Sequence, residues 1–465
     1  MNRPRRLKVI TLGCSKNSVD TEHLLAQLPA DAYSVVEGDE PVDVLLLNTC
    51  GFIGDAKEES VNAILAAVEA KKRGEAGELI VFGCLSQRYP DELRAEIPEV
   101  DAWYGARELA PVLRHLGVKP GPLTARYQPR PQGYAYLKIS EGCDRRCSYC
   151  AIPFIRGAHR SVPMEALVEE ASSLAARGVK ELILIAQDTT YYGLDLYGRR
   201  ALGELLERLS AIPGIVWIRI HYSYPADFPE DVLQAMANNP KVCRYLDIPL
   251  QHIADGMLER MHRHVDGAWT RALIARLRAE VPGVALRTTM IVGHPGETEE
   301  EFAELLDFVR EARFERLGAF MYSEEEGTWG AKHLRDDVPA EVKQERLDRL
   351  MELQRDISLA CNQARVGSEV LVIVDDFLPG ESPDSGAEKA EPELVFRQTC
   401  PENNSGPRVC KTSAPEIAVC RSEFESPEVD GEILLRNPSP GLRVGDMVRV
   451  KIVAAEDYDL IAEMI

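Results

Sequence analysis

Short hydrophobic runs alternate with longer amphipathic stretches over the first 120 residues of the chain. The runs KVITLGC, VDVLLLNTC and ELIVFGC each lead into a stretch whose apolar positions have helical spacing. This alternation predicts a small α/β domain with a parallel sheet. Residues 119–133 follow with several prolines and no periodicity, which predicts a linker.

The alternation resumes in the middle of the chain and predicts six further strands. Each of the first five runs is followed by a stretch of helical length with mixed polar and apolar positions. The six runs are Tyr134–Ile139, Glu181–Ala186, Ile215–Ile220, Cys243–Ile248, Ala285–Val292 and Leu317–Tyr322. Six strand-helix units predict an open, partial barrel, with an active site at the carboxyl ends of its strands.

A helix and a small β domain are predicted for the last part of the chain. Residues 341–360 place five apolar side chains close to one helical face, which is typical of a connecting helix. These side chains are Val342, Leu347, Leu350, Leu353 and Ile357. The runs EVLVIVDDF, EILLRN, MVRVKIVAAEDY and LIAEMI predict a small β-barrel or sandwich. Residues 379–419 are rich in Pro, Glu and Ser, which indicates an inserted loop.

The chain is therefore expected to be an α/β protein of three domains. The predicted domains are residues 1–120, residues 133–365 with the connecting helix, and residues 366–465 with the insertion. A length of 465 residues is sufficient for three separate cores.

The composition excludes two broad classes of protein. The chain is 45% hydrophobic and 28% charged, with a mean hydropathy of -0.20, so neither a disordered chain nor a membrane protein is expected. The longest apolar runs, such as Val44–Leu47 and Leu182–Ala186, are far shorter than the roughly 18 residues that a membrane span requires. The basic start of the chain has no small-residue cleavage site, so a cytoplasmic protein is expected.

The charge balance indicates the kind of partner. The chain carries 54 basic and 75 acidic residues, for a net charge of -21. Binding to nucleic-acid phosphates is driven by Lys and Arg, so this balance disfavours such binding over the whole surface. It favours a basic partner instead. Residues 375–465 alone hold 19 acidic and 9 basic side chains, and the insertion is expected to supply much of that charge.

Three cysteines form a CxxxCxxC motif directly after the first predicted strand of the barrel. They are Cys143, Cys147 and Cys150 in EGCDRRCSYC. Three thiolates at this spacing can bind three irons of a 4Fe-4S cluster and leave the fourth iron open to an exogenous ligand. The alternative is a structural zinc site, but such a site needs four ligands and no second Cys or His pair is visible.

A second set of cysteines ends the three hydrophobic runs of the N-terminal domain. Cys14, Cys50 and Cys84 stand at the same point of three successive strand-helix units. The carboxyl ends of parallel strands share one edge of a sheet, so these thiols are expected to converge there as a second three-cysteine site. The alternative is three buried core cysteines, since Cys is among the most buried residue types.

The other candidate residues have weaker signals. Cys243 and Cys361 are expected to be core residues, and His262–His264 is expected to be solvated surface at a polar helix end. Residues 291–302, IVGHPGETEEEF, predict a strand, a glycine turn that allows close approach of a ligand, and an acidic helix start. Three evenly spaced cysteines in the insertion region, Cys400, Cys410 and Cys420, could hold a metal or form a redox pair, but the sequence favours no role for them.

These motifs resemble those of a known family. A CxxxCxxC motif after the first strand of a partial barrel resembles the radical S-adenosylmethionine superfamily, and three cysteines on a preceding α/β domain resemble its methylthiotransferases. The segments similar to the ribosomal-protein branch are ISEGCDRRCSYCAIPFIRG, IAQDTTYYG, IRIHYSYP, YLDIPLQH, SPEVDGEILL and EDYDL. The resemblance covers residues 7–375 and about 420–465.

The resemblance implies two 4Fe-4S clusters and S-adenosylmethionine as cofactors. Cys143, Cys147 and Cys150 would hold the cluster that cleaves S-adenosylmethionine to a 5′-deoxyadenosyl radical. The auxiliary cluster, which carries the sulfur to be methylated and transferred, would be held by Cys14, Cys50 and Cys84. The residues expected in the S-adenosylmethionine pocket are Gln187, Thr289 and Gly293.

The resemblance also implies the partners. The substrate would be the β-carbon of an aspartate in small-subunit ribosomal protein number twelve, free or on the ribosome. The C-terminal β domain would be a TRAM module that recognises it. A low-potential electron donor is expected, whereas no membrane and no tRNA partner is expected. Two alternatives stay open: a tRNA (adenine-2) methylthiotransferase and a non-catalytic iron-sulfur or zinc scaffold.

Two features depart from the family pattern. After Arg156 and Gly157 the family usually continues to Ser-Arg-Pro, whereas this chain has Ser161, Val162 and Pro163. The arginine role is therefore either lost or taken by Arg160. The insertion is not part of the pattern either.

Overall fold

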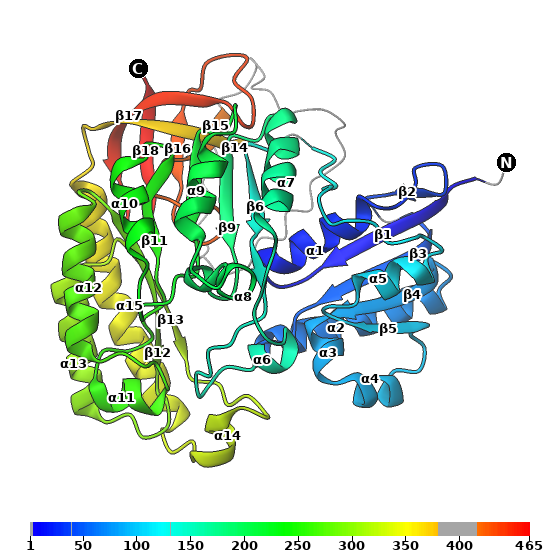
Figure 1. Cartoon of the computed structure of the whole chain (residues 1–465), viewed down its shortest axis with the longest axis horizontal. Coiled ribbons are helices and arrows are strands. Elements are labelled where there is room, and N and C mark those ends of the chain that lie inside the picture. Colours follow the sequence, from blue (N-terminus) through cyan, green and yellow to red (C-terminus); the bar gives the residue numbers. More distant parts are fainter. Residues whose placement is uncertain (1–2, 39, 131, 380–415) are drawn as a thin grey trace, which may run out of the picture. The chain divides into compact units, whose positions relative to one another are not determined.

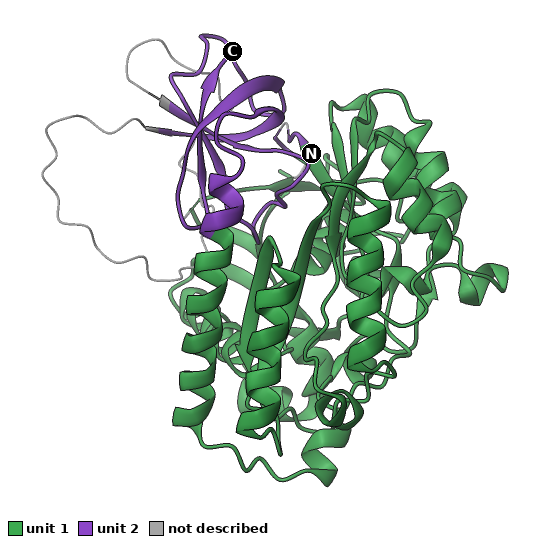
Figure 2. Cartoon of the chain, turned by 90° about the vertical axis from the view of Figure 1, so that its left-hand side faces the viewer, with its two compact units in different colours: residues 1–128, 134–358 green, residues 129–133, 359–465 purple. Residues whose placement is uncertain are grey.

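The computed structural model describes residues 3–38, 40–130, 132–379 and 416–465. These residues form two compact units, one of Met1–Gln128 with Tyr134–Ser358 and one of Pro129–Gly133 with Leu359–Ile465 (Figure 2). The three-domain division made from the sequence stays a prediction. Within the described residues, no helix combines the length and hydropathy that a membrane span requires.

A five-stranded parallel sheet forms the N-terminal part of the first unit, in the order β2-β1-β3-β4-β5 (Figure 1). The strands are β1 (Arg5–Thr11), β2 (Tyr33–Val35), β3 (Val42–Thr49), β4 (Ala76–Gly83) and β5 (Ala102–Gly105). The helices are α1 (Ser15–Leu25), α2 (Gly54–Lys72), α3 (Cys84–Arg88), α4 (Pro90–Glu96) and α5 (Leu109–His115). The parallel α/β domain predicted from the sequence is confirmed.

Both faces of this sheet are buried, which explains why its strands read as continuous hydrophobic runs. Alternate residues of β3 belong to separate cores: Leu45 and Leu47 pack with α2, and Val44 and Leu46 pack with α1 and α5. The period-two alternation of a strand thus divides one apolar run between two layers of helices.

A six-stranded parallel sheet forms the rest of the first unit, in the order β13-β12-β11-β10-β9-β6. Its strands are β6 (Tyr134–Lys138), β9 (Glu181–Ile185), β10 (Trp217–Ile220), β11 (Val242–Asp247), β12 (Ala285–Val292) and β13 (Arg316–Met321). The longer helices are α7 (Met164–Ala176), α9 (Leu202–Ser210), α10 (Glu230–Asn238), α12 (Gly267–Glu280) and α13 (Glu299–Ala312). All six predicted strands and the open, partial barrel are confirmed.

Short elements occupy the loops of this sheet. They are β7 (Ser140–Glu141), β8 (Arg160–Ser161), α6 (Ile152–Ile155), η1 (Thr189–Tyr191), α8 (Leu194–Tyr197), α11 (Asp255–Arg260) and α14 (Trp329–His333). The acidic start of α13 is a capping box, in which Thr298 and Glu301 exchange side-chain and backbone hydrogen bonds. The predicted strand, glycine turn and helix start at residues 291–302 are therefore confirmed.

A long helix leads into a closed β-barrel. The predicted connecting helix is α15 (Ala340–Gln363), in which Leu350 and Ile357 are buried and the other three predicted side chains are half-buried. The barrel order is β14-β15-β16-β18-β17. Its strands are β14 (Glu369–Pro379), β15 (Glu416–Arg421), β16 (Ile433–Arg436), β17 (Met447–Ala455) and β18 (Leu460–Met464).

The end of the predicted insertion was placed wrongly. Residues 416–419 are not loop but the first part of β15, which pairs with β14 and β16. Cys420 on this strand is fully buried in the barrel core. The apolar run of β15 is only four residues long, residues 417–420, and directly follows the polar segment, so it was not recognised as a strand. Cys400 and Cys410 lie outside the described residues.

The two remaining cysteines differ from each other. Cys243 lies in β11 and is only 2% exposed, which confirms a core residue. Cys361, near the end of α15, is half-buried, so the prediction of a core residue was wrong there.

A buried carboxylate joins the N-terminal sheet to the central sheet. Glu325, which follows β13, is 3% exposed and accepts from Lys57 Nζ at 2.9 Å and from Arg88 Nη1 at 2.6 Å. Lys57 belongs to α2 and Arg88 to α3, so one side chain of the central part holds two helices of the N-terminal part.

The predicted linker is anchored by one arginine. Residues 119–128 contain no helix or strand, but Arg126 is 6% exposed. Its guanidinium donates to Glu22 Oε2 at 2.8 Å, to Glu170 Oε1 at 2.8 Å and to the carbonyl oxygen of Tyr136 at 2.7 Å. The segment therefore follows a defined path between α1 and α7.

Replacement of Arg126 by Gln is expected to lower the free energy of unfolding by about 3 kcal/mol, because it leaves the carboxylate of Glu170 buried without its cation. Urea denaturation of the metal-free protein measures this change. Arg73→Gln, which breaks a pair with Glu75 on the surface at 2.7 Å, is the matched control and should leave the midpoint unchanged. Equal effects of the two variants would show that Arg126 is not an anchor.

Candidate functional site

The three N-terminal cysteines lie at the carboxyl ends of three neighbouring strands. Cys14 follows β1 and immediately precedes α1, Cys50 follows β3, and Cys84 is the first residue of α3 after β4. Since β1, β3 and β4 are adjacent in the sheet, the predicted convergence on one sheet edge is confirmed.

Two glycines allow the cysteine loops to pack against each other. Gly13 has a φ of +90°, and a Cβ there would lie 2.7 Å from the Cβ of Cys50. A Cβ on Gly51 would lie 2.7 Å from the Cα of Leu85, next to Cys84. No side chain fits at either position, so the three loops depend on these glycines for their close approach.

Two buried asparagines hold the same strand ends in place. The Asn17 amide donates to the carbonyl oxygens of Leu12 at 2.8 Å and Thr49 at 3.3 Å. Asn48 donates to the carbonyl oxygen of Asn17 at 2.9 Å. These bonds satisfy carbonyl groups at the ends of β1 and β3 and in the first turn of α1.

The CxxxCxxC loop is anchored by its backbone at the edge of the central sheet. The Cys143 amide donates to Gly157 O at 3.0 Å, and Ser148 both donates to Met261 O at 3.1 Å and accepts from the Gly330 amide at 2.7 Å. Cys143, Cys147 and Cys150 are all half-buried. The loop is thus held on two sides while its thiols remain partly open.

The cysteines within each set affect one another's pKa. The pKa of Cys84 is raised to about 12, chiefly by burial, with Arg156 lowering it and the neighbouring sulfurs of Cys14 and Cys50 raising it. Burial likewise raises the pKa of Cys143 to about 12, with Cys147 adding to the shift. Thiols in this environment need a cation to ionise, and metal binding to cysteine releases the proton.

The donor set fits an iron-sulfur cluster, whose usual ligands are cysteine thiolates. Among the described residues, no group of three or more His, Cys, Asp or Glu side chains is arranged to hold a single metal ion. A cluster places each cysteine on a different iron, so its ligands are farther apart than those of one ion. The assignment of the six cysteines stays a prediction.

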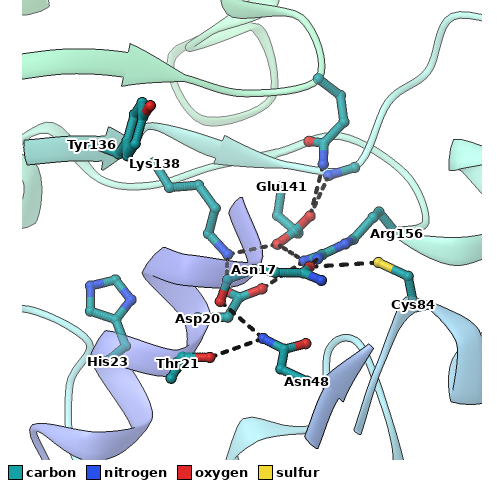
Figure 3. Close-up of polar contacts among 12 residues, drawn as sticks. Asn17, Asp20, Thr21, His23, Asn48, Cys84, Tyr136, Lys138, Glu141 and Arg156 are labelled. Atoms are coloured by element: carbon teal, nitrogen blue, oxygen red, sulfur yellow. Dashed lines mark hydrogen bonds and ion pairs between the residues drawn. The ribbon is translucent and has the colours of Figure 1, made fainter. Parts of the chain in front are cut away.

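Arg156 belongs to a buried polar network that also includes Asn17, Asp20 and Glu141 (Figure 3). Its guanidinium lies 2.8 Å from Asp20 Oδ2 and 3.0 Å from Glu141 Oε2, and it donates to Asn17 Oδ1. The Cys84 thiol donates to the same Asn17 oxygen at 3.7 Å. Arg156 therefore connects the N-terminal set with the strand end that leads into Cys143.

Lys138 completes this network from β6. Its ammonium group pairs with Asp20 and with Glu141 Oε2, the latter at 2.8 Å. Burial alone would raise the pKa of Glu141, but the charges of Lys138 and Arg156 hold that pKa at about 2. Two cations and two carboxylates thus form a charge-balanced cluster.

The three residues predicted for the S-adenosylmethionine pocket lie on two strands of the central sheet. Gln187 follows β9, donates to Glu141 Oε1 at 3.1 Å, and has a buried carbonyl oxygen with no partner in the described part of the chain. Thr289 is half-buried in β12. Gly293 follows β12 with a φ of +69°, and a Cβ there would meet Lys343 Cγ at 2.2 Å. Packing thus accounts for this glycine, and the pocket assignment stays a prediction.

Sequence reasoning missed the charged residues of the site. Asp20 and Lys138 belonged to no motif, and Arg156 was noted only as part of a family-like segment, so no local signal indicated that these charges meet. Arg160, the suggested substitute for the missing arginine, is exposed on β8. In HRH, His264 is exposed as predicted, but His262 is half-buried against Trp329 with ring centroids 4.4 Å apart, and Arg263 is buried.

Family models match three segments of the chain. Residues 6–105 match the Uncharacterized protein family UPF0004, residues 137–309 match the Radical SAM superfamily, and residues 409–465 match the TRAM domain. A protein named ribosomal protein uS12 methylthiotransferase RimO from Porphyromonas gingivalis is 49% identical over 468 residues, with 100% of both chains covered. Its namesake from Phocaeicola vulgatus is 47% identical, with 99% of both chains covered. The chain belongs to the RimO family.

A solved structure agrees with this fold. The radical S-adenosylmethionine methyltransferase TsrM from Kitasatospora setae has a TM-score of 0.52 at 15% identity, and the match covers 68% of this chain and 72% of that chain. A radical SAM enzyme outside the RimO family therefore shares this fold. The ribosomal-protein branch expected from the sequence is confirmed, and the tRNA-modifying alternative is not favoured by the names of the RimO relatives.

The pair Asp20 and Lys138 is expected to be energetically coupled. A double-mutant cycle with Asp20→Asn and Lys138→Gln, read by urea denaturation, should give a coupling energy of about 2 kcal/mol, because each change leaves a buried charge that the other relieves. The same cycle on Glu69 and Lys72, a surface pair at 2.9 Å, serves as control and should show no coupling. Additive effects at Asp20 and Lys138 would contradict a single network.

Proposed function

We propose that this chain inserts a methylthio group at the β-carbon of an aspartate of the small-subunit ribosomal protein uS12. The observation that carries the proposal is full-length identity of 47–49% to proteins named for that activity. The two cysteine sets at the carboxyl ends of two parallel sheets support it, because a radical methylthiotransferase needs one site for radical formation and one for sulfur.

Two 4Fe-4S clusters and S-adenosylmethionine are the proposed cofactors. Cys143, Cys147 and Cys150 would hold one cluster, and Cys14, Cys50 and Cys84 the other. When bound, these groups supply the electron that cleaves S-adenosylmethionine and the sulfur that is transferred. The unpartnered carbonyl oxygen of Gln187 would accept a hydrogen bond from bound S-adenosylmethionine, and Thr289 on β12 and Gly293 directly after β12 would complete the pocket.

The surrounding residues keep both sites rigid and water-poor. Arg156 and Lys138 neutralise Asp20 and Glu141 inside the protein, so the strand end before Cys143 is fixed without solvent. Arg156 also holds Asn17 beside Cys84. The chain's own contribution is therefore positioning, and the bound groups perform the bond-breaking steps.

The charge of the C-terminal barrel supports a basic protein substrate. Residues 369–379 and 416–465 hold 14 acidic and 5 basic side chains, whereas residues 380–415 hold only 6 and 4. The expectation that the insertion supplies much of the charge was therefore wrong, because the barrel itself is acidic. An RNA-binding module carries the opposite sign. An acidic module attracts and orients a basic ribosomal protein, at a rate that falls as salt rises.

The remaining partners follow from the substrate. A ribosomal protein is made in the cytoplasm, which is where we place this activity. A low-potential electron donor is needed to reduce the cluster at Cys143, Cys147 and Cys150. The substrate is taken either free or on the ribosome.

Mutation is expected to separate the functions of the two cysteine sets. The anaerobically reconstituted chain should hold about eight irons, and a Cys14, Cys50 and Cys84 triple Ala variant should hold about four. That variant should still cleave S-adenosylmethionine to 5′-deoxyadenosine after reduction and form no methylthio product. The reciprocal variant at Cys143, Cys147 and Cys150 should also hold about four irons but cleave nothing. A parent chain that never exceeds four irons would refute the two-site assignment.

The substrate is tested by competition. The reconstituted enzyme is given purified uS12 and bulk tRNA in one reaction, and mass spectrometry follows both. We expect a mass gain of one methylthio group on an aspartate of uS12 and none on tRNA, with a rate that falls as salt rises. Modification of tRNA with none on the protein would replace this function by the tRNA-modifying alternative.

A further inference from the structure

Arg263 stands in a stretch of unusual backbone conformation. It follows α11, and both of its neighbours have positive φ, +55° at His262 and +57° at His264. Left-handed conformations are costly for residues with a Cβ, and they persist where surrounding contacts require them. In this stretch they accompany a side chain turned inward: Arg263 is 4% exposed, whereas His264 is exposed.

The guanidinium of Arg263 lies against the CxxxCxxC loop. Its Nη1 donates to Cys147 Sγ at 3.4 Å and to the Tyr149 hydroxyl at 3.3 Å. Its Nη2 donates to the carbonyl oxygen of Pro249 at 2.5 Å. One face of the guanidinium covers the ring of Tyr224, with Cζ 4.3 Å from the ring centroid.

None of these partners is a carboxylate. Within the described part of the chain Arg263 forms no ion pair, and its Nε is buried without a hydrogen-bond partner. A buried cation without a counter-charge is strongly unfavourable. Arg145 shows the usual solution nearby: it covers the same Tyr224 ring at 4.0 Å, but its Nε donates to Asp188 Oδ2 at 2.9 Å.

We propose that Arg263 is the counter-charge of the cluster held by Cys143, Cys147 and Cys150, and that it sets the reduction potential of that cluster. The proposal rests on the proposed function, because the bound cluster would be the anion that Arg263 lacks in the protein alone. A guanidinium beside a thiolate forms a charge-assisted hydrogen bond. Net charge and hydrogen bonds to sulfur are among the factors that set such potentials. Arg263 acts through Cys147 and is a positioning residue.

The sign of the effect follows from the charge of the reaction. Reduction moves one electron from a low-potential donor, which is oxidised, to the cluster, which becomes more negative. A neighbouring guanidinium stabilises the reduced form more than the oxidised form. Arg263→Gln is therefore expected to lower the equilibrium constant for reduction about tenfold, a shift of about 59 mV to lower potential for a one-electron step. Arg263→Lys keeps the charge, so its reduction potential should stay closer to that of the unsubstituted chain.

The experiment uses the full chain with Cys14, Cys50 and Cys84 replaced by Ala, so that one cluster contributes to the signal. Iron content and absorbance first establish that the cluster is present. Electron paramagnetic resonance then follows its reduction in a potential titration, with and without Arg263→Gln or Arg263→Lys. A variant that holds about four irons at an unchanged potential overturns the proposal for Arg263. A triple Ala background that binds no cluster overturns the proposed site instead.

Two further variants separate charge from structure. Arg278→Gln removes a half-buried guanidinium that lies 2.9 Å from Glu315 and donates to Ala312 O. Arg278 lies at the opposite ends of the strands from the CxxxCxxC loop, so this variant should leave the reduction potential unchanged. Tyr224→Leu removes the ring that holds Arg263 and should lower the potential by less than Arg263→Gln. If Arg263→Gln does not fold, an unchanged potential in Tyr224→Leu overturns the proposal. An Arg263 variant that unfolds at a lower midpoint but keeps its reduction potential also overturns the proposal.

Discussion

Parallel strand pairing is the constraint on which both cysteine sets depend. In a parallel sheet all strands run the same way, so the loops at their carboxyl ends share one edge. Strands β1, β3 and β4 bring Cys14, Cys50 and Cys84 together from three loops, and the central sheet does the same for the CxxxCxxC loop, Gln187 and Gly293. The N-terminal set cannot form from a local stretch of chain, whereas the CxxxCxxC set lies in one loop and depends on the sheet for its place beside the other strand ends. A defect in strand order would therefore abolish a site rather than weaken it.

Buried charge has different roles at the two sites. Around Arg156 it is balanced within the protein, since Asp20 and Glu141 match Arg156 and Lys138. Such clusters contribute more to geometry than to stability, because desolvation offsets most of their attraction. Around Arg263 the protein leaves a positive charge unbalanced beside Cys147. The first arrangement fixes the position of a loop, and the second provides an electrostatic environment for a bound anion.

Most of the fold could be predicted from the sequence because each strand of the two parallel sheets is a compact hydrophobic run followed by a helical stretch. The cysteines were found for the same reason, since their position at the strand ends repeats. The contacts of Arg156 could not be predicted, because Asp20 lies 136 positions away and no local pattern pairs them. Arg263 was hidden between two histidines that suggest a polar surface. Strand β15 was missed because its apolar run is only four residues long and adjoins a polar segment.

Glu325 is synthesised long after the two cations that it binds. Lys57 and Glu325 are 268 positions apart, and a ribosome that adds about 5–20 residues per second needs roughly 13–54 s to cover that interval. While the intervening residues are being added, Lys57 and Arg88 have no Glu325 carboxylate to pair with. Arg88 belongs to the helix that Cys84 opens and also donates to Gly51 O beside Cys50 at 3.1 Å. The edge of the sheet that carries Cys50 and Cys84 therefore acquires this buried ion pair only after the chain has been extended past β13.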